Sequence, residues 1–109
     1  MKYLIFKYYV PTIECMKLTT KIFEIVKRIP KGEVMTYKEI ARFAGNEKAY
    51  RSVGRILHTN TDPKNIPCHR VVKSDFTLAN GYAFGGRDAQ KKKLINEGII
   101  FEKNKIKKL

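Results

Sequence analysis

TYKEIARFAGNEKAYRSVGRILH, residues 36–58, is the stretch that decides the fold of this chain. Thr36 and Glu39 have the spacing of a capping box, in which a hydroxyl and a carboxylate bind the free amides at a helix start. We therefore expect a short helix, then a tight turn containing Gly45, then a second helix over residues 47–58. This order predicts a helix-turn-helix unit.

Apolar and basic residues separate onto two faces of the expected second helix. Val53, Ile56 and Leu57 recur at helical spacing, so they share one face, which we expect to lie in the core. Arg51, Arg55 and His58 follow the same helical spacing on another face. The pattern predicts a basic stripe on the outer surface.

The flanking sequence predicts a small α/β domain that is mostly helical and winged-helix-like. An amphipathic helix over residues 18–29 should precede the central unit, with Thr19 or Thr20 as its N-cap. Residues 66–73 are rich in β-branched side chains and predict a short extended segment. A last helix over residues 87–97 should end at a glycine.

A chain of 109 residues fits one domain. We divide it into an N-terminal segment, 1–17, a folded domain, 18–99, and a basic tail, 100–109, which we expect to fray or to lie on a partner. Lys7 interrupts the apolar start and no cleavage site of small residues follows, so we expect this run in the mature protein. No apolar stretch approaches the roughly 20 residues that span a bilayer.

The charge of the chain indicates its partner. Twenty-three Lys and Arg against ten Asp and Glu give a formal net charge of +13, which is typical of proteins that bind polyanions. We expect nucleic acid, with a solvated basic surface or an anionic membrane as the alternatives. Cys15 and Cys68 show no disulfide spacing, which predicts a reducing, cytoplasmic compartment, and Cys15 is interpreted as a small hydrophobic residue.

The segment Pro67-Cys68-His69-Arg70 has a thiol, an imidazole and a guanidinium in consecutive residues, which makes it the strongest candidate for a reactive site. A thiol is nucleophilic as a thiolate, and an adjacent imidazole can lower its pKa or take its proton, directly or through a water. The pair alone also fits a buried structural cysteine. The cysteines and histidines lack the spacing of a zinc site, so we expect no metal. A cysteine hydrolase would need an oxyanion site, which no pattern marks.

Together the helix-turn-helix and this segment resemble the O6-alkylguanine-DNA alkyltransferases, repair proteins that move an alkyl group from a damaged guanine onto their own cysteine. The similarity covers the C-terminal DNA-binding and active-site domain of that family, from about residue 18 to 99. It rests on the order and spacing of several short motifs: IPKGEV at 29–34, TY at 36–37, RSVG at 51–54, IPCHRVV at 66–72, GY at 81–82 and EG at 97–98.

The resemblance implies a cofactor-free reaction. Cys68 would accept the alkyl group, His69 would deprotonate it through a water, and Glu97 would orient His69. Asn60 would brace the turn beside the active site. Tyr37 would press on the phosphate of the damaged nucleotide.

The resemblance also implies a surface for duplex DNA. Arg51 would fill the hole left by the extruded nucleotide, while the small residues Ala49, Ser52 and Gly54 would let the helix approach the minor groove. The full set of implied DNA-binding residues is Tyr37, Lys38, Asn46, Ala49, Tyr50, Arg51, Ser52, Gly54, Arg55 and Ser74. The implied base pocket consists of Leu57, Val71, Tyr82 and Ala83.

We therefore predict a monomer that repairs O6-alkylguanine, or O4-alkylthymine, in a single turnover. Two other functions are possible. Alkyltransferase-like proteins are similar in length, bind alkylated DNA without repairing it and have tryptophan at the cysteine position; this chain retains Cys68, which favours transfer. A helix-turn-helix regulator that reads the major groove would leave residues 67–72 unexplained. Phe76 stands at a loop position that is usually glycine in the family.

Overall fold

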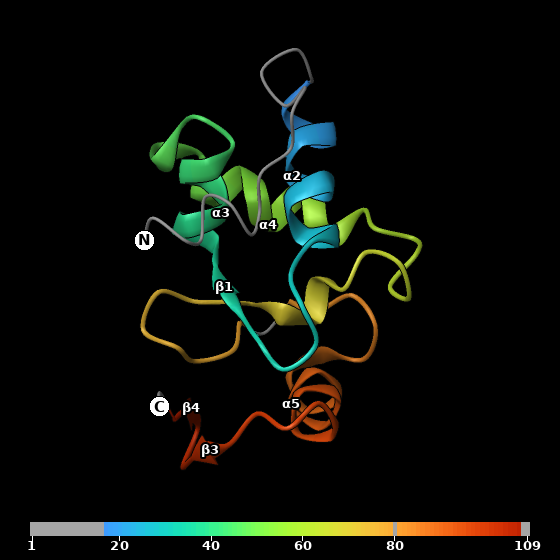
Figure 1. The fold of residues 1–109 in the computed structure, drawn as a ribbon, viewed down its shortest axis with the longest axis vertical. Helices are drawn as coiled ribbons and strands as arrows, with labels where there is room; N and C mark the ends of the chain where they lie inside the picture. The colour runs from blue at the N-terminus through green and yellow to red at the C-terminus, as the bar shows by residue number, and fades with distance from the viewer. Residues whose placement is uncertain (1–16, 80, 108–109) are drawn as a thin grey trace.

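The computed structural model describes residues 17–79 and 81–107. The expected N-terminal segment, apart from residue 17, and Cys15 lie outside this part, so the structure bears on neither prediction. Helices α2 (Leu18–Lys27), α3 (Tyr37–Phe43) and α4 (Tyr50–His58) gather at one end of the molecule, and α5 (Gly86–Asn96) lies at the other end (Figure 1). The mostly helical α/β class is confirmed.

Helix α2 begins at Leu18, the predicted first residue, but its N-cap and its end differ from the prediction. Its N-cap is Lys17, whose side chain makes no capping bond, and Thr19 and Thr20 lie inside the first turn, so the predicted cap is wrong. The bond from the Lys21 amide to the Lys17 carbonyl already closes a helical turn there. The helix ends at Lys27, before the predicted end, and buries Ile22, Ile25 and Val26.

The helix-turn-helix is confirmed and its first cap is the predicted capping box. Glu39 N donates to Thr36 Oγ1 at 3.1 Å, and Thr36 N donates to Glu39 Oε1 at 3.0 Å. The second helix differs from its prediction, because its first turn is the 3₁₀ helix η2 (Glu47–Ala49) and α4 starts only at Tyr50. The side chain of Asn46 caps η2 by accepting a bond from Lys48 N.

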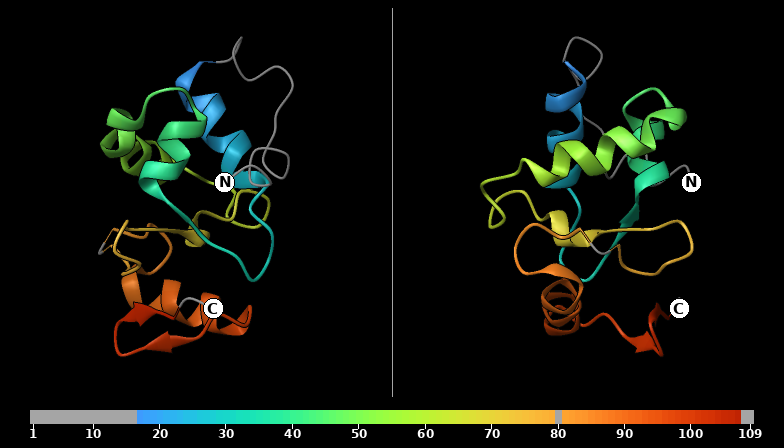
Figure 2. Two further views of the ribbon diagram at one scale, coloured as in Figure 1. Left: turned by 60° about the vertical axis from the view of Figure 1, so that its left-hand side comes forward. Right: turned by 180° about the vertical axis from the view of Figure 1, so that it is seen from behind.

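The segment predicted to be extended is mostly a turn. Strand β2 (Val71–Val72) contains only two residues, and the 3₁₀ helix η3 (Cys68–Arg70) precedes it. The amides of Cys68 and Arg70 donate to the carbonyls of Ile66 and Pro67 and so cannot join a strand ladder. Strand β2 pairs in parallel with β1 (Met35–Thr36), and this two-stranded sheet lies between the two groups of helices (Figure 2).

The described part of the basic tail, residues 100–107, is folded, so the prediction that this part frays is wrong. Strands β3 (Phe101–Glu102) and β4 (Lys105–Ile106) form an antiparallel hairpin. Ile106 is buried in a small apolar cluster with Val72, Leu78 and Leu94. Lys103, Lys105 and Lys107 are exposed, while Ile106 anchors the hairpin to the domain, because burying a large aliphatic side chain contributes about 1.5–3 kcal/mol. Phe101 of β3 packs against the same cluster.

One strained residue supports the hairpin. Ile106 N donates to the carbonyl of Phe76, whose φ of 65° lies in the left-handed region that favours glycine. Phe76, at the position where glycine was expected, therefore has a backbone conformation typical of glycine. Its phenyl ring packs against the cluster around Ile106.

The larger core lies among α2, α3 and α4. Its members are apolar residues with exposures of 6% or less, namely Ile22, Ile25, Val26, Ile29, Met35, Ile40, Ala41, Ala44, Val53, Leu57, Cys68 and Val71. Val53 and Leu57 thus face inward as predicted, and Arg51, Arg55 and His58 are exposed. In the described part of the chain no helix has the length and apolar character needed to cross a bilayer.

Candidate active site

Cys68 lies at the start of η3 with 6% of its surface exposed. Burial raises the pKa of its thiol, and a hydrogen bond from Asn60 and the positive charge of Lys93 lower it only in part. At neutral pH the side chain is therefore a thiol. A nucleophilic thiolate has to be formed by proton transfer at the moment of reaction.

Asn60 ties the end of α4 to the turn before Cys68. Its Nδ2 donates to Cys68 Sγ at 3.4 Å and to the carbonyl of Ile66 at 2.9 Å. Its Oδ1 accepts a bond from Asp62 N at 2.9 Å. The amide is 5% exposed and all these partners are local, so Asn60 sets the position of the sulfur relative to the helix.

His69 is the neighbouring base. Burial lowers its pKa, Glu97 opposes this effect, and Arg70 and Lys93 add to it, so the imidazole is neutral at pH 7 and able to accept a proton. Its Nε2 lies 3.0 Å from Glu97 Oε2, off the line of a directed hydrogen bond. Its Nδ1 has no hydrogen-bond partner among residues 17–79 and 81–107.

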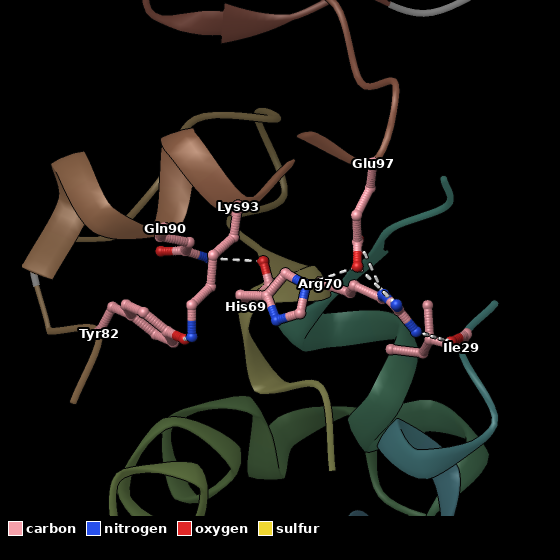
Figure 3. Close-up of polar contacts among 7 residues, drawn as sticks. All are labelled: Ile29, His69, Arg70, Tyr82, Gln90, Lys93 and Glu97. Atoms are coloured by element: carbon pink, nitrogen blue, oxygen red, sulfur yellow. Dashed lines mark hydrogen bonds and ion pairs between the residues drawn. The ribbon is translucent and has the colours of Figure 1, made fainter. Parts of the chain in front are cut away.

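Glu97 is held by a two-pronged contact with Arg70 (Figure 3). Arg70 Nε donates to Glu97 Oε1 at 2.9 Å and Nη2 donates to Oε2 at 2.6 Å. The guanidinium also donates from Nη1 to the carbonyl of Ile29 at 2.7 Å. These bonds from Arg70 lower the pKa of Glu97 to about 2, so the carboxylate beside His69 stays ionised.

Motif and spacing assign no role to three residues of this site. The first is Arg70, which binds Glu97. Gln90 is 3% exposed and donates from Nε2 to the carbonyls of His69 and Val71, at 2.9 and 3.0 Å. Lys93 donates from Nζ to Tyr82 Oη at 2.6 Å. The available signal was spacing, since positions 90, 93 and 97 lie on one helical face.

A cavity of about 30 Å³ opens onto Cys68. Three residues of the predicted base pocket, Leu57, Tyr82 and Ala83, line it, together with Tyr37, Gly54, His58, Gly81 and Gln90. The fourth, Val71, does not line this cavity: it is 1% exposed, and its backbone pairs with Met35 across the sheet. The base pocket itself stays a prediction. The cavity has room for one water and not for a purine, so a base can enter only if the walls move.

An open hollow of about 480 Å³ adjoins this cavity. The two share Tyr37, Gly54, His58 and Gly81, so the hollow leads toward Cys68. Seven residues of the predicted DNA-binding set line the hollow, namely Tyr37, Lys38, Tyr50, Arg51, Gly54, Arg55 and Ser74. The other three do not: Asn46 caps η2, Ser52 Oγ accepts a bond from Arg55 Nη2, and Ala49 belongs to η2.

The hollow is basic and aromatic. Lys38 Nζ and the Arg51 guanidinium lie 5.5 and 5.8 Å from the centre of the Tyr50 ring. Burial and the neighbouring Cys68 raise the pKa of Tyr37, so its hydroxyl remains protonated and can donate a hydrogen bond. The positive charges and hydroxyl donors that line the hollow beside Cys68 suit an anionic ligand.

The model of one protein family, the DNA-binding domain of 6-O-methylguanine DNA methyltransferase, matches residues 17–99. The chain belongs to this family. The methylated-DNA--protein-cysteine methyltransferase of Rattus norvegicus is 40% identical over 78 residues, which are 72% of this chain and 37% of that protein. Alkyltransferase-like protein 1 of Schizosaccharomyces pombe is 36% identical over 80 residues, 73% of this chain and 74% of that protein.

Solved structures agree with the family assignment. The S. pombe alkyltransferase-like protein in complex with damaged DNA containing O6-carboxymethylguanine gives a TM-score of 0.70 at 32% identity, covering 86% of this chain and 92% of that one. The Mycobacterium tuberculosis O6-methylguanine methyltransferase gives 0.67 at 29% identity, covering 75% and 48%. The chain thus spans less than half of the methyltransferases and most of the alkyltransferase-like protein.

Proposed function

We propose that this protein repairs DNA by moving the alkyl group of an O6-alkylguanine onto Cys68. The observation that carries the proposal is the placement of a buried thiol at the end of a basic hollow, beside a neutral imidazole and an ionised carboxylate. The named relatives support the same class of reaction, since several are methylated-DNA--protein-cysteine methyltransferases.

The chemistry needs only groups of this chain. His69 takes the thiol proton through a water, and Glu97 stabilises the imidazolium that forms. The thiolate forms an S–C bond to the alkyl carbon while the C–O6 bond breaks and its electron pair moves into the purine ring. The purine then takes a proton at a ring nitrogen and becomes guanine. The thioether on Cys68 has no good leaving group, so each protein molecule reacts once and needs no cofactor.

Access to the thiol requires nucleotide flipping. An alkylated base inside a duplex is out of reach, and its extrusion costs a few kcal/mol. Arg51 is exposed at the hollow, where its planar guanidinium can fill the vacated stack and recover part of that cost. Tyr37 lines both the hollow and the cavity, in the position to press on the phosphate of the extruded nucleotide.

Duplex DNA is the partner that this proposal requires. The S. pombe relative has been solved in complex with DNA, which supports this partner, and the charge of +13 supports binding to phosphates. A monomer, approach from the minor groove and a cytoplasmic location stay predictions.

The alternative function is a sensor that binds alkylguanine and does not repair it. It is favoured by one observation: the fold matches that of the S. pombe alkyltransferase-like protein with a TM-score of 0.70 at 32% identity. The presence of Cys68 at a cavity that adjoins the open hollow favours alkyl transfer instead.

Intact-mass measurement separates the two. Wild-type protein mixed with duplex DNA containing O6-methylguanine should gain one methyl group, located by peptide mapping on Cys68 and not on Cys15, with at most one lesion repaired per molecule. Cys68→Ala should bind the same duplex and never gain mass. Tight lesion binding by the wild type without a change in mass would replace the repair function by the sensor.

A further inference from the structure

Lys93 reaches from the last turn of α5 to the wall of the Cys68 cavity. Its Nζ donates to Tyr82 Oη at 2.6 Å, and Tyr82 lines that cavity (Figure 3). The same ammonium lies 5.2 Å from the centre of the Tyr82 ring and 5.7 Å from the centre of the Phe84 ring. One cation therefore holds two aromatic side chains of the loop before α5.

Packing and two backbone contacts also hold the described part of the loop that carries Tyr82, and both Tyr82 and Phe84 pack against the larger apolar core. His58 Nδ1 lies 3.1 Å from the carbonyl of Gly81, and Gly86 N donates to the carbonyl of Tyr82 at 2.9 Å. Both bonds hold the backbone. The Tyr82 ring itself meets Phe84 edge-on at 5.7 Å, and its hydroxyl is fixed by Lys93.

The hydrogen bond also orients the Tyr82 hydroxyl. An ammonium has no acceptor, so the oxygen of Tyr82 accepts from Lys93 and the hydroxyl hydrogen points elsewhere. A hydroxyl that already accepts a bond from a cation is a stronger donor. Tyr82 therefore offers a polarised donor at a cavity that also contains the nucleophile.

We propose that Lys93 is a positioning residue of the alkyl transfer, one that fixes the Tyr82 wall of the cavity and places a positive charge beside the nucleophile and the departing purine. The inference rests on the proposed function. As the C–O6 bond breaks, negative charge moves from sulfur into the purine. A fixed cation at the cavity wall stabilises that charge more in the transition state than in the free protein.

The charges around Cys68 and His69 support this role. They also predict the direction in which loss of Lys93 should shift the pKa of each group. Lys93 lowers the pKa of both the Cys68 thiol and the His69 imidazole, whereas Glu97 raises the pKa of His69. The other groups that face them are Tyr37 from α3, Asn60 after α4, His58 from α4 and Arg70 from η3. Removing the charge of Lys93 should raise the pKa of both groups, which makes the thiol harder to ionise and the base easier to saturate with protons.

The test compares Lys93→Met, Lys93→Arg and Lys92→Met in single-turnover methyl transfer from duplex DNA, followed by intact mass across pH 5–9. Methionine keeps the length of the lysine stem without its charge, arginine keeps the charge, and Lys92 is an exposed neighbour on the same helix. Lys93→Met should slow transfer at pH 7 roughly tenfold and move the acid limb of the rate profile to higher pH. Lys93→Arg should recover most of the rate, Lys92→Met should match the wild type, and duplex affinity should change by less than about twofold in all three variants.

A second measurement keeps the two proposals apart. Iodoacetamide alkylates a thiolate with loss of iodide and needs no DNA, so its rate at Cys68, read by peptide mapping, reports ionisation of the thiol alone. Lys93→Met should lower this rate at pH 7–8, and Lys92→Met should not. If wild type modifies Cys68 with iodoacetamide faster than Lys93→Met but never takes a methyl group from DNA, the repair function fails, Lys93 has no role in alkyl transfer, and only its charge effect on the Cys68 thiol remains. If repair proceeds and Lys93→Met matches Lys92→Met in both assays, the inference is overturned and the repair function stands.

Discussion

Replacing Glu97 by Gln should weaken both the fold and the reaction, through one pair of contacts. The carboxylate accepts bonds of 2.9 and 2.6 Å from Arg70, with the two side chains only 15% and 12% exposed. Glutamine keeps the size but loses the charge, and its amino group must face a donor of Arg70. Hydrogen bonds to charged groups contribute about 1.5–3 kcal/mol each, and one can survive, so we expect a loss of about 2–3 kcal/mol in the free energy of unfolding. For a domain of this size that is a fall of roughly 8–12 °C in Tm.

The loss of stability should depend on pH in a defined direction. The pKa of Glu97 falls from its ordinary 4.5 to about 2 in the folded protein. Its contribution is therefore complete above about pH 4.5 and disappears as the pH falls toward 2. Wild type should lose this part of its stability over that window, and Glu97→Gln should not. Chemical denaturation at several pH values measures the difference.

The reaction should change in a second way. A positioned general base contributes about 10²–10⁴ in rate, and Glu97 acts through His69, so we expect transfer at pH 7 to fall about ten- to hundredfold. Because Glu97 raises the pKa of His69, the acid limb should move to lower pH, opposite to the shift expected for Lys93→Met. Single-turnover methyl transfer across pH 5–9 measures both effects.

The control is Glu24→Gln, which removes an exposed ion pair with Lys27 at 3.4 Å and should cost less than about 0.5 kcal/mol without any effect on transfer. Duplex affinity of Glu97→Gln should stay near that of the wild type. If Glu97→Gln leaves both the acid limb and the plateau of the pH–rate profile of methyl transfer unchanged, Glu97 does not act through His69.

Three further results are expected. Arg51→Ala should slow repair of duplex DNA far more than reaction with a free O6-alkylguanine base, since only the duplex has a stack to fill; equal losses in the two assays would exclude Arg51 as the intercalating residue. Neutralising Lys103 and Lys105 with Gln should flatten the dependence of log affinity on log salt by up to about 2 without altering lesion preference, measured by fluorescence anisotropy, and an affinity insensitive to salt would exclude phosphate contacts. Leu94→Ala, at a side chain that is fully buried, should lower the free energy of unfolding by about 2–5 kcal/mol in urea denaturation, whereas a loss below about 1 kcal/mol would show that the smaller apolar cluster is not well packed.

Local patterns were enough to predict the helical framework. The capping box at Thr36 and Glu39 and the helical spacing of Val53 and Leu57 report contacts within one or two turns, which the sequence encodes directly. Predictions that depend on contacts between distant segments were less accurate, and residues 66–70 are an example. Whether residues 66–70 extend or turn depends on which amides find partners in the strand ladder, and that depends on the position of β1.

The C-terminal hairpin is a similar case. A stretch rich in lysine has the composition of a fraying tail, and a single isoleucine gives little periodic signal. Ile106 becomes an anchor only because α5 and the loop around Phe76 bring the smaller cluster to it. Burial of one residue against distant partners outweighs local composition.

By itself the sequence determined the family and the helix-turn-helix and indicated Cys68 as the candidate nucleophile, because these rest on motif order and on side-chain chemistry that is independent of coordinates. Only the tertiary structure decided how the reacting groups are tuned. His69 meets Glu97, Arg70 meets Glu97, and Lys93 meets Tyr82 across separations of 28, 27 and 11 residues. The physical reason is that burial and charge act through space: the desolvation that keeps Cys68 a thiol and His69 neutral comes from elements packed around them, which no local pattern records.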